Sequence, residues 1–443
     1  MNNHVLDISM LNADSKTFWA DLDQAVQLDT AQDISIQQTV NDILMHIKTD
    51  GDKSLIEYTN KFDNRELRVA QDFCLNPSHL KQAFDNLEEE QKQALQTAYN
   101  RLLEYHQRQR AISGESWEFY DEHDSLLGQK VSPIDSVGIY VPGGKASYPS
   151  SVLMNAVPAK VAGVPNIIMA VPAPNNYVNE LVLAAAYLTG VNKVYTIGGA
   201  QAIAALAYGT QTISAVNKIV GPGNAYVAQA KRQVFGKVGI DMIAGPSEIL
   251  IIADGTVNPD WIAMDLFSQA EHDELAQSIL ISLDEEYSQK VIHSMNKLIE
   301  DMPRKEIIIQ SINNRGLIIN VDNIQAACKI SNYIAPEHLE IASIKPEDYL
   351  PLIQNAGAIF IGAYSSEALG DYCAGPNHVL PTSGTAKFSS PLGVYDFQKR
   401  SSILHISKEG AQTLGETTKI LATAEGLHAH AKSAEFRMLK TMS

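Results

Sequence analysis

The end of one predicted helix carries two side chains that could bind a metal together. Asn258 can cap this helix and Pro259 suits its first position, so a helix is predicted over 259–272. Gln269 and His272 stand three residues apart on one helix face, where an amide oxygen and an imidazole nitrogen can point to the same place. A plain polar face, with His272 stabilised by the helix dipole, explains the pair at least as well. The pair therefore predicts a metal site only together with donors elsewhere in the chain.

Carboxylates and imidazoles also occur side by side in later segments. Glu337 and His338 suit general acid–base chemistry, because histidine titrates near neutrality and a neighbouring carboxylate can activate water. An exposed turn with two polar residues is the alternative for this pair. The other groups are Asp371 with His378, and Glu425 with His428 and His430. In a chain with only 12 histidines, this clustering indicates a shared site.

Two glycine turns follow predicted strands and precede predicted helices. They are GGAQ (198–201) and GPGN (221–224). Glycines let the backbone approach a ligand closely, and a helix N-terminus favours an anion, so a nucleotide can bind at such turns. The dinucleotide fingerprint is incomplete, because Tyr226 stands where its third glycine would be. Each turn alone could also be a plain tight connection.

One serine precedes a predicted strand in the segment AGPSE (244–248). Ser247 could contact a substrate, or its hydroxyl could only stabilise the turn. No Gly-x-Ser-x-Gly elbow surrounds Ser247, which argues against a serine nucleophile.

Predicted strands and helices alternate through the middle of the chain. The first series has strands at 137–141, 166–171, 193–197 and 218–220 and helices at 178–189, 200–208 and 225–234. The second series has strands at 248–253, 278–282, 316–321 and 358–361 and helices at 259–272, 287–301 and 347–355. This alternation predicts an α/β fold of two tandem, incomplete Rossmann-like, doubly wound units, with a ligand in the cleft between them.

The flanking regions differ from this middle part. Residues 1–130 are expected to be mostly helical and to pack on the α/β core, with a helix around 40–48 and a long charged helix over 77–110. The two units are expected at 131–245 and 246–385, followed by a helical C-terminal region at 386–443.

Composition narrows the possible partners and the location. The net charge of −17 and the lack of a basic cluster argue against nucleic acid and anionic membranes as partners. No apolar run is long enough to cross a bilayer, and the first residues do not resemble a secretory signal, so a cytoplasmic protein is expected. The 3 cysteines (Cys74, Cys328 and Cys373) are far apart and form neither a disulfide framework nor a zinc knuckle. A bound metal would therefore need His, Asp, Glu or amide ligands.

Several segments together resemble the histidinol dehydrogenase family. They are GGAQAIAALAYGT (198–210), GPGNAYV (221–227), AGPSE (244–248), FSQAEHD (267–273), APEHLE (335–340) and GDYCAGPNHVLPT (370–382). The resemblance extends from about 38 to 437 and is loosest between 100 and 135. It implies an NAD-dependent, zinc-requiring, four-electron oxidation of L-histidinol to L-histidine through L-histidinal, the last step of histidine biosynthesis.

The resemblance also implies roles for single residues. One zinc ion per subunit would be held by Gln269, His272, Asp371 and His430, and NAD would contact Tyr140, Gln201 and Asn224. His338 would accept the hydroxyl proton, and Glu337 would activate the water that adds to the aldehyde. The substrate contacts would be Ser247, Gln269, His272, His338, Asp371, His378, Glu425 and His430.

In this family the C-terminal helices of one subunit complete the site of the other. The resemblance therefore implies a homodimer with shared active sites, in which Glu425 and His430 act in trans. Residues 131–245 would be the NAD side, 246–385 would carry the metal and acid–base residues, and 386–443 would form the dimerisation region.

Other interpretations remain open at this point. A relative could oxidise another polyfunctional alcohol with the same zinc and NAD, Glu337 could activate water in a zinc hydrolase, or the chain could be a noncatalytic metal-binding dimer. His428 could replace His430 as a ligand, since the choice depends on the family spacing from Glu425. Cys373 could compete for the metal, although a small buried filler is the simpler interpretation.

Overall fold

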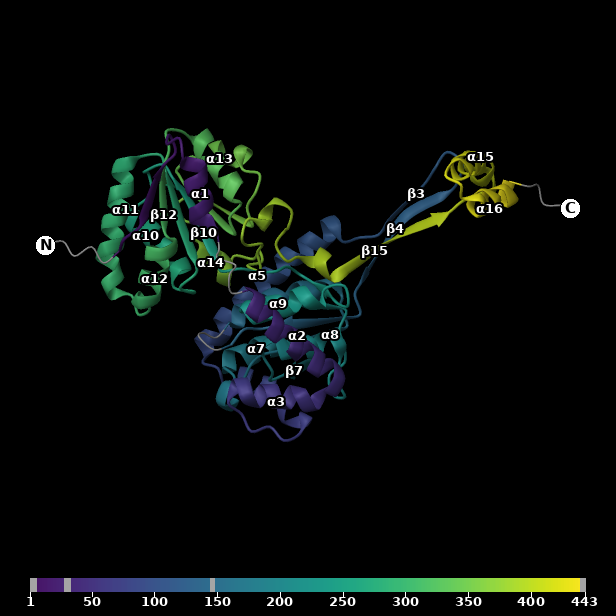
Figure 1. Cartoon of the computed structure of the whole chain (residues 1–443), viewed down its shortest axis with the longest axis horizontal. Helices are drawn as coiled ribbons and strands as arrows, with labels where there is room; N and C mark the ends of the chain where they lie inside the picture. The colour runs from purple at the N-terminus through teal and green to yellow at the C-terminus, as the bar shows by residue number, and fades with distance from the viewer. Residues whose placement is uncertain (1–5, 28–32, 144–147, 439–443) are drawn as a thin grey trace.

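The computed structural model describes residues 6–27, 33–143 and 148–438, which form two α/β lobes and a projecting arm (Figure 1). The first lobe contains the sheet β2-β7-β6-β5-β8-β9. Its parallel strands are β5 (Ser136–Tyr140), β6 (Asn166–Ala170), β7 (Lys193–Tyr195), β8 (Lys218–Val220) and β9 (Gly239–Ile240). The connecting helices include α6 (Pro149–Ala162), α7 (Glu180–Thr189), α8 (Gly199–Tyr208) and α9 (Ala225–Val234).

The second lobe repeats the same strand order in the sheet β1-β12-β11-β10-β13-β14. Its strands are β10 (Glu248–Ala253), β11 (Gln277–Ser282), β12 (Leu317–Asn320), β13 (His338–Ala342) and β14 (Ala358–Ile361), all parallel. The helices are α10 (Pro259–Ala270), α11 (Glu285–Leu298), α12 (Lys305–Arg315), α13 (Ile324–Ile334) and α14 (Glu367–Tyr372). Every residue of β10 and β11 is buried, as expected for a parallel sheet covered on both faces. The predicted α/β fold with two doubly wound units is confirmed.

The N-terminal region is mostly helical, as predicted, but it also supplies strands to all 3 sheets. Strand β1 (Ser9–Asn12) pairs with β12, and with α1 (Phe18–Val26) it lies in the second lobe (Figure 1). Strand β2 (Cys74–Leu75) pairs antiparallel with β7 in the first lobe. The N-terminal region therefore joins both lobes.

The remaining N-terminal helices cover the first sheet. They are α2 (Asp33–Asp50), α3 (Asp52–Asp63), α4 (Pro77–Asn86) and α5 (Glu89–Ser113). Helix α2 packs against α8 and α9, while α4 packs against α7 and α5 against α6. The single helix predicted over 77–110 is wrong, because the chain is extended at Leu87 and Glu88 between α4 and α5.

A second error concerns the helix predicted over 347–355. The structure has two 3-10 turns there, at Pro346–Asp348 and Leu350–Leu352. Pro351 has no N–H group to donate within an α-helix, which shortens this segment to a turn. The crossover between β12 and β13 is made instead by α13, which Asn323 caps by accepting from Ala326 N at 2.9 Å.

The arm combines an antiparallel sheet with a helical pair. Strands β3 (Trp117–Tyr120), β4 (Leu126–Pro133) and β15 (Gln398–His405) extend away from the lobes, and α15 (Lys408–Ala424) packs on α16 (His428–Met438) at the far end (Figure 1). The described part of the C-terminal region is thus helical at 408–424 and 428–438, but strand β15 precedes these helices, so the predicted helical region does not begin at 386.

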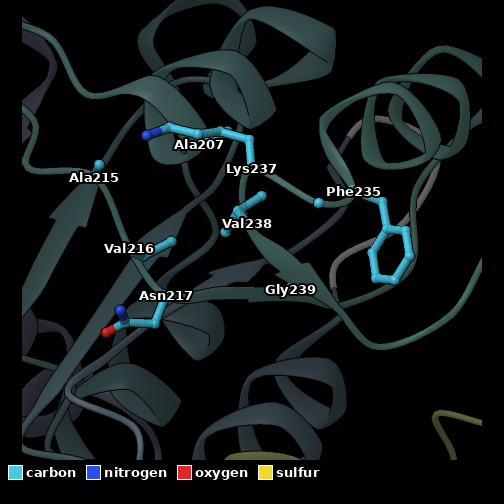
Figure 2. A pocket seen from close by; sticks show the side chains of 9 residues that line it. Ala207, Ala215, Val216, Asn217, Phe235, Lys237, Val238 and Gly239 are labelled. Carbon is cyan, nitrogen blue, oxygen red and sulfur yellow. The ribbon is translucent and has the colours of Figure 1, made fainter. Parts of the chain in front are cut away.

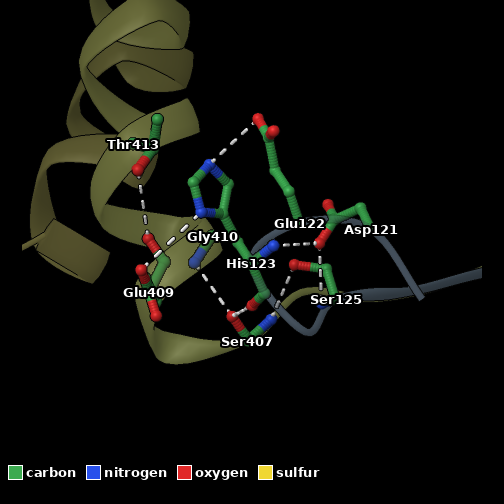
Figure 3. A network of polar contacts seen from close by, with 8 residues as sticks. All are labelled: Asp121, Glu122, His123, Ser125, Ser407, Glu409, Gly410 and Thr413. Atoms are coloured by element: carbon green, nitrogen blue, oxygen red, sulfur yellow. Dashed lines mark hydrogen bonds and ion pairs between the residues drawn. The ribbon is translucent and has the colours of Figure 1, made fainter.

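Polar contacts fix α15 to the β3–β4 turn (Figure 3). Ser407 caps α15 by accepting from Gly410 N at 2.9 Å, and Ser407 N donates to Ser125 Oγ at 3.2 Å. The ring of His123 lies between Glu122 and Glu409, with N···O distances of 3.6 and 3.7 Å. The helical pair is therefore anchored to the hairpin.

Within the described residues, the structure contains no helix that combines the length and the apolar character needed to cross a bilayer.

Candidate active site and metal centre

The predicted acid–base pair lies at the amino end of β13 and is buried. Helix α13 ends at Ala335 with a φ of 55°, and the chain then turns so that Glu337 and His338 are only 6% and 3% exposed. Glu337 Oε2 accepts a hydrogen bond from Glu248 N at 2.9 Å. His338 Nδ1 donates to Glu248 O, also at 2.9 Å. The first residue of β10 thus orients both side chains, and the alternative of an exposed turn is wrong.

Gln269 contacts this pair from the last turn of α10. Its side chain is fully buried, and with its amide nitrogen turned toward Glu367 it donates to Glu367 Oε1 at 2.9 Å. Glu367 is itself buried, and its backbone N–H donates to Glu340 Oε1 at 2.6 Å. Glu367 Oε1 lies 3.8 Å from His338 Nδ1. Glu367 therefore links α10 to the imidazole.

Asp371 reaches the same place from the short helix α14. Gly370 allows this approach, because a Cβ at Gly370 would lie 2.5 Å from the ring of Phe360. Asp371 Oδ1 lies 3.5 Å from His338 Nε2. Ligand atoms of His338, Glu367 and Asp371 all lie within 4.8 Å of one another, a separation that one metal ion could bridge. The sequence prediction included Asp371 among the metal ligands and His338 as a base, but it missed Glu367.

His272 and His378 face the same carboxylate. Burial lowers the pKa of His272, although the nearby Asp371 opposes this change. Burial likewise lowers the pKa of His378, again opposed by Asp371. Neutral imidazoles at neutral pH are the form that binds a metal. Burial favours the neutral carboxyl of Asp371, yet its interactions with His338 and the other two imidazoles hold its pKa below the usual value.

The surroundings raise the pKa values of both central residues. Burial raises the pKa of Glu337 to about 8, with His338 opposing the shift. Burial alone would lower the pKa of His338, but the carboxylates of Glu367 and Glu337, with Asp371, raise it well above 6.5. Strongly shifted pKa values of neighbouring buried groups are typical of acid–base sites.

The donors fit a divalent cation. Among the described residues, the ring atoms His338 Nε2 and His378 Nε2 are buried and have no hydrogen-bond partner. An unpartnered buried nitrogen is costly, and a ligand can satisfy it. The surrounding donors are imidazole nitrogens and carboxylate or amide oxygens, a set that suits zinc and similar ions.

The predicted NAD residues gather at the carboxyl edge of the first sheet. Tyr140 ends β5, and its hydroxyl accepts from Gly199 N at 3.0 Å. Asn224 caps α9 by accepting from Tyr226 N and Val227 N, both at 3.1 Å. Gln201 lies in the first turn of α8 and is 1% exposed. The strand order reverses between β5 and β8, the position where such sheets bind nucleotides.

The two units use opposite sheet edges. Tyr140 and the GPGN turn lie at carboxyl ends of strands, whereas Glu248 and His338 lie at the amino ends of β10 and β13. The short segment 241–247 leads directly from β9 to β10 and carries the half-buried Ser247. The connection therefore brings the carboxyl edge of the first sheet to the amino edge of the second.

Within a single chain, the last two predicted site residues do not lie near the others. Glu425 and His430 are exposed, and they belong to the segment around α15 and α16 at the end of the arm (Figure 1). His428 is exposed beside them. The arm holds this group away from the lobes that contain Gln269, His272 and Asp371.

A surface pocket of about 510 Å³ lies elsewhere on the first lobe (Figure 2). Asn217 and Gly239, which line it, stand at the amino ends of β8 and β9, opposite the glycine turns. Its lining includes the exposed ring of Phe235 and the side chain of Lys237, but no carboxylate or imidazole. This pocket lacks the groups for the chemistry expected above.

The sequence and fold both match known proteins. The family model for histidinol dehydrogenase matches residues 27–438. A histidinol dehydrogenase of Neisseria gonorrhoeae is 58% identical over 97% of this chain and 99% of its own length. One from Dechloromonas aromatica is 58% identical over 95% of this chain and 96% of its own length. The crystal structure of histidinol dehydrogenase from Elizabethkingia anophelis is 34% identical, with a TM-score of 0.92 over 99% of both chains. The chain therefore belongs to the histidinol dehydrogenase family.

Proposed function

We propose that this chain catalyses the NAD-dependent oxidation of L-histidinol to L-histidine through L-histidinal. The observation that carries the proposal is the buried Glu337–His338 pair, which is surrounded by side chains that can bind a metal. The segment 241–247 connects this part of the second lobe to the first lobe, where the GPGN turn could bind a nucleotide. In the overall reaction, histidinol, water and two NAD⁺ yield histidine, two NADH and three protons. The reaction is the last step of histidine biosynthesis.

The first stage requires a base for the alcohol proton. His338 accepts this proton as the carbinol hydride passes to NAD⁺, which leaves the aldehyde and NADH. In the structure the surrounding carboxylates raise the pKa of His338, so its ring favours the charged form. Neutralisation of Asp371 by a bound cation would lower this pKa and restore a neutral base.

The second stage requires water. Glu337 removes a proton from water as the oxygen adds to the aldehyde carbon, and the resulting hydrate gives its hydride to a second NAD⁺. The hydrogen bond from Glu248 N holds the Glu337 carboxylate beside His338 during both stages. Ser247, His378 and Glu425 would contribute further substrate contacts.

A zinc ion would be held by Gln269, His272 and Asp371, with His430 supplied by a second subunit. When bound, the ion supplies Lewis-acid anchoring of the substrate, so that the carbinol is oriented toward His338. The exposure of Glu425 and His430 at the end of the arm supports sharing between subunits, since they would otherwise serve no site.

Each region of the chain would then have its own role. Residues 131–245 would bind NAD through Tyr140, Gln201 and Asn224, and 246–385 would carry the metal and acid–base residues. Residues 386–443 would complete the site of a partner in a homodimer, and 1–130 would pack on the core.

The proposal is tested by mixing purified, zinc-loaded protein with L-histidinol and NAD⁺ and following NADH absorbance. We expect two NADH for each histidine formed and loss of activity when a chelator removes the metal. No NADH with histidinol, but NADH with another polyfunctional alcohol, would assign a different substrate. Hydrolysis without NADH formation would contradict a dehydrogenase altogether.

A further inference from the structure

A buried ion pair lies directly beneath the GPGN turn. Lys231 of α9 and Asp241, which follows β9, pair through Nζ and Oδ1, and their side chains are only 3% and 1% exposed. Lys231 Nζ also donates to Gly221 O at 2.9 Å. Gly221 N in turn donates to Asp241 Oδ2 at 2.7 Å. Both backbone polar groups of one glycine are thus held by one ion pair.

This glycine sits where the turn touches a neighbouring strand. Gly221 has a φ of 110°, a conformation that other residues adopt only with strain. A Cβ at Gly221 would also lie 2.1 Å from Tyr140 O at the end of β5. The ion pair therefore holds the turn in a backbone shape that also brings it against Tyr140.

Stability alone gives little reason for two charges in this position. Transferring a lysine and an aspartate from water to the interior costs several kcal/mol per ion, and apolar residues of similar size often give an equally stable fold. What an apolar pair could not provide is a donor for Gly221 O and an acceptor for Gly221 N. The geometry thus indicates that the charges serve to orient the turn.

Asp241 also begins the segment that joins the two units. This segment, 241–247, leads to Glu248, whose backbone N–H and carbonyl contact Glu337 and His338. Along the way, Gly245 N donates to Thr382 Oγ1 at 2.6 Å. A displacement of Asp241 would therefore affect the turn on one side and the connection to the acid–base pair on the other.

We propose that Lys231 and Asp241 are positioning residues for NAD. They hold the Gly221 turn in the shape that receives the cofactor and fix the position of this turn relative to the Glu337–His338 pair. The inference rests on the proposed function, because it assumes that NAD binds at the GPGN turn. Neither side chain is expected to touch the cofactor, since both are buried beneath the turn.

The decisive variant is Lys231→Met/Asp241→Asn, which removes both charges at once and leaves no buried charge unpaired. For the zinc-loaded, full-length protein we expect the Kd for NAD⁺ and the KM for NAD⁺ to rise about tenfold or more, a change that corresponds to about 1.4 kcal/mol. Zinc content and the KM for histidinol should stay at wild-type values. If this variant does not fold, Asp241→Asn alone, which keeps an acceptor for Gly221 N, is expected to show a smaller rise of the same kind.

A matched control exists at the other end of β8. Lys218 Nζ donates to Asp396 O at 2.8 Å and lies 3.2 Å from Asp396 Oδ1, with side chains 16% and 24% exposed. The variant Lys218→Met/Asp396→Asn should lose some thermal stability and leave NAD⁺ affinity unchanged. This comparison separates an effect on the turn from general damage to the first unit.

Two results would overturn the inference: an unchanged Kd for NAD⁺ in the Lys231/Asp241 variants, or equal losses of NAD⁺, histidinol and zinc binding. Failure of the proposed function is distinguishable, since wild-type protein would then neither bind NAD⁺ nor form NADH. If wild-type protein binds NAD⁺ and forms NADH, and the Lys231/Asp241 variants bind NAD⁺ as tightly as wild type, the inference is wrong and the proposed function stands.

Discussion

Glu337 and His338 stand next to each other in the chain, and their environments raise both pKa values for different physical reasons. Burial raises the pKa of Glu337 to about 8, while surrounding carboxylates raise that of His338 despite its burial. Both shifts favour the protonated form. A cation beside Asp371 would favour the deprotonated forms of both residues, because positive charge lowers both pKa values. In the proposed mechanism, a bound cation would therefore favour both residues as bases near neutral pH.

Replacing Glu337 by Gln should separate the two stages of the reaction. The amide keeps an acceptor for Glu248 N but cannot take a proton from water, so histidinal oxidation should slow by about 100-fold or more. The histidinol stage should be less affected, because His338 remains. An aldehyde-trapping reagent should then detect histidinal and about one NADH for each molecule trapped. Equal slowing of both stages would refute the separate role of Glu337.

The choice between His430 and His428 can be decided by metal content. We expect His430→Ala to abolish zinc retention, whereas His428→Ala should retain it, because only His430 has the ligand spacing from Glu425. Metal is measured after gel filtration at neutral pH. The reverse result would reassign the ligand. Cys373→Ser provides a control that should keep its zinc, and zinc loss there would instead identify the thiol as a ligand.

The sequence predicted side chains that lie together in the structure, but not the groups that orient them. Gln269, Glu337, His338 and Asp371 stand in recognisable motifs, and the structure brings them together in one chain. Glu367 gave no signal, because it lies outside these motifs and reaches Gln269 only through tertiary packing. The backbone of Glu248 likewise contributes through its N–H and carbonyl groups, which any residue type except proline would offer.

At the element scale, the N-terminus of α9 should bind the cofactor only when its first turn is ordered. Asn224→Ala removes the acceptor for Tyr226 N and Val227 N, which should cost about 1 kcal/mol of stability. The KM for NAD⁺ should rise by roughly tenfold if about 1.4 kcal/mol of binding free energy is lost with it. Thermal unfolding and NADH kinetics measure the two effects.

Helix α7 offers a matched control for this change. Asn179 caps it by accepting from Leu181 N at 2.8 Å, and α7 carries no predicted NAD contact. Asn179→Ala should therefore cost similar stability without changing the KM for NAD⁺. A similar rise in both variants would show that the KM responds to stability and not to the turn.

Helix α10 and strand β13 place two carboxyl groups against each other in the interior. Burial raises the pKa of Asp265 to about 6 and that of Glu340 well above 4.5. Because both folded-state pKa values exceed the unfolded ones, the folded state holds the extra protons. The resulting stability is complete below about pH 3.8 and is lost as pH rises through about 6 and beyond.

Replacing this pair by amides should flatten the pH dependence of stability. Between about pH 4 and 7, metal-free Asp265→Asn/Glu340→Gln should lose less stability than wild type, and the contribution of Asp265 alone is on the order of 3 kcal/mol. Chemical denaturation at several pH values measures the difference. Parallel profiles for the two proteins would contradict the assigned protonation states.

The sequence predicts well those helices and strands whose own residues show a clear apolar run or periodicity. Strand β10 was predicted at its observed bounds, because its residues are all buried and its run is continuous. Strand β1 has no such signal, since it forms only by pairing with β12 more than 300 residues away. Helix α6 is buried on nearly all sides, so it lacks the periodicity that marks an amphipathic helix. Strand β3 is exposed throughout and depends on its pairing with β4.

At the scale of the whole molecule, the arm leaves large apolar side chains uncovered in a single chain. Trp117, Tyr120, Leu404 and Phe436 are 54%, 67%, 67% and 67% exposed. Trp117 also stacks on the exposed ring of Phe119, and clustered exposed apolar groups are typical of a surface that binds another protein. In the proposed homodimer, the second subunit would cover them, and Glu425 and His430 of this arm would reach the metal donors of that subunit.

Sharing between subunits predicts that two inactive variants can restore each other. His430→Ala and Asp371→Ala should each be inactive as homodimers, because every site lacks one zinc ligand. In a mixed dimer, the lobe of the His430→Ala subunit keeps Asp371 and receives an intact His430 from its partner, so one of the two sites is complete. Unfolding equal amounts together and refolding them should restore about a quarter of wild-type activity, since about half of the dimers are mixed and each has one working site. Sites built within one chain would leave the refolded mixture as inactive as either parent.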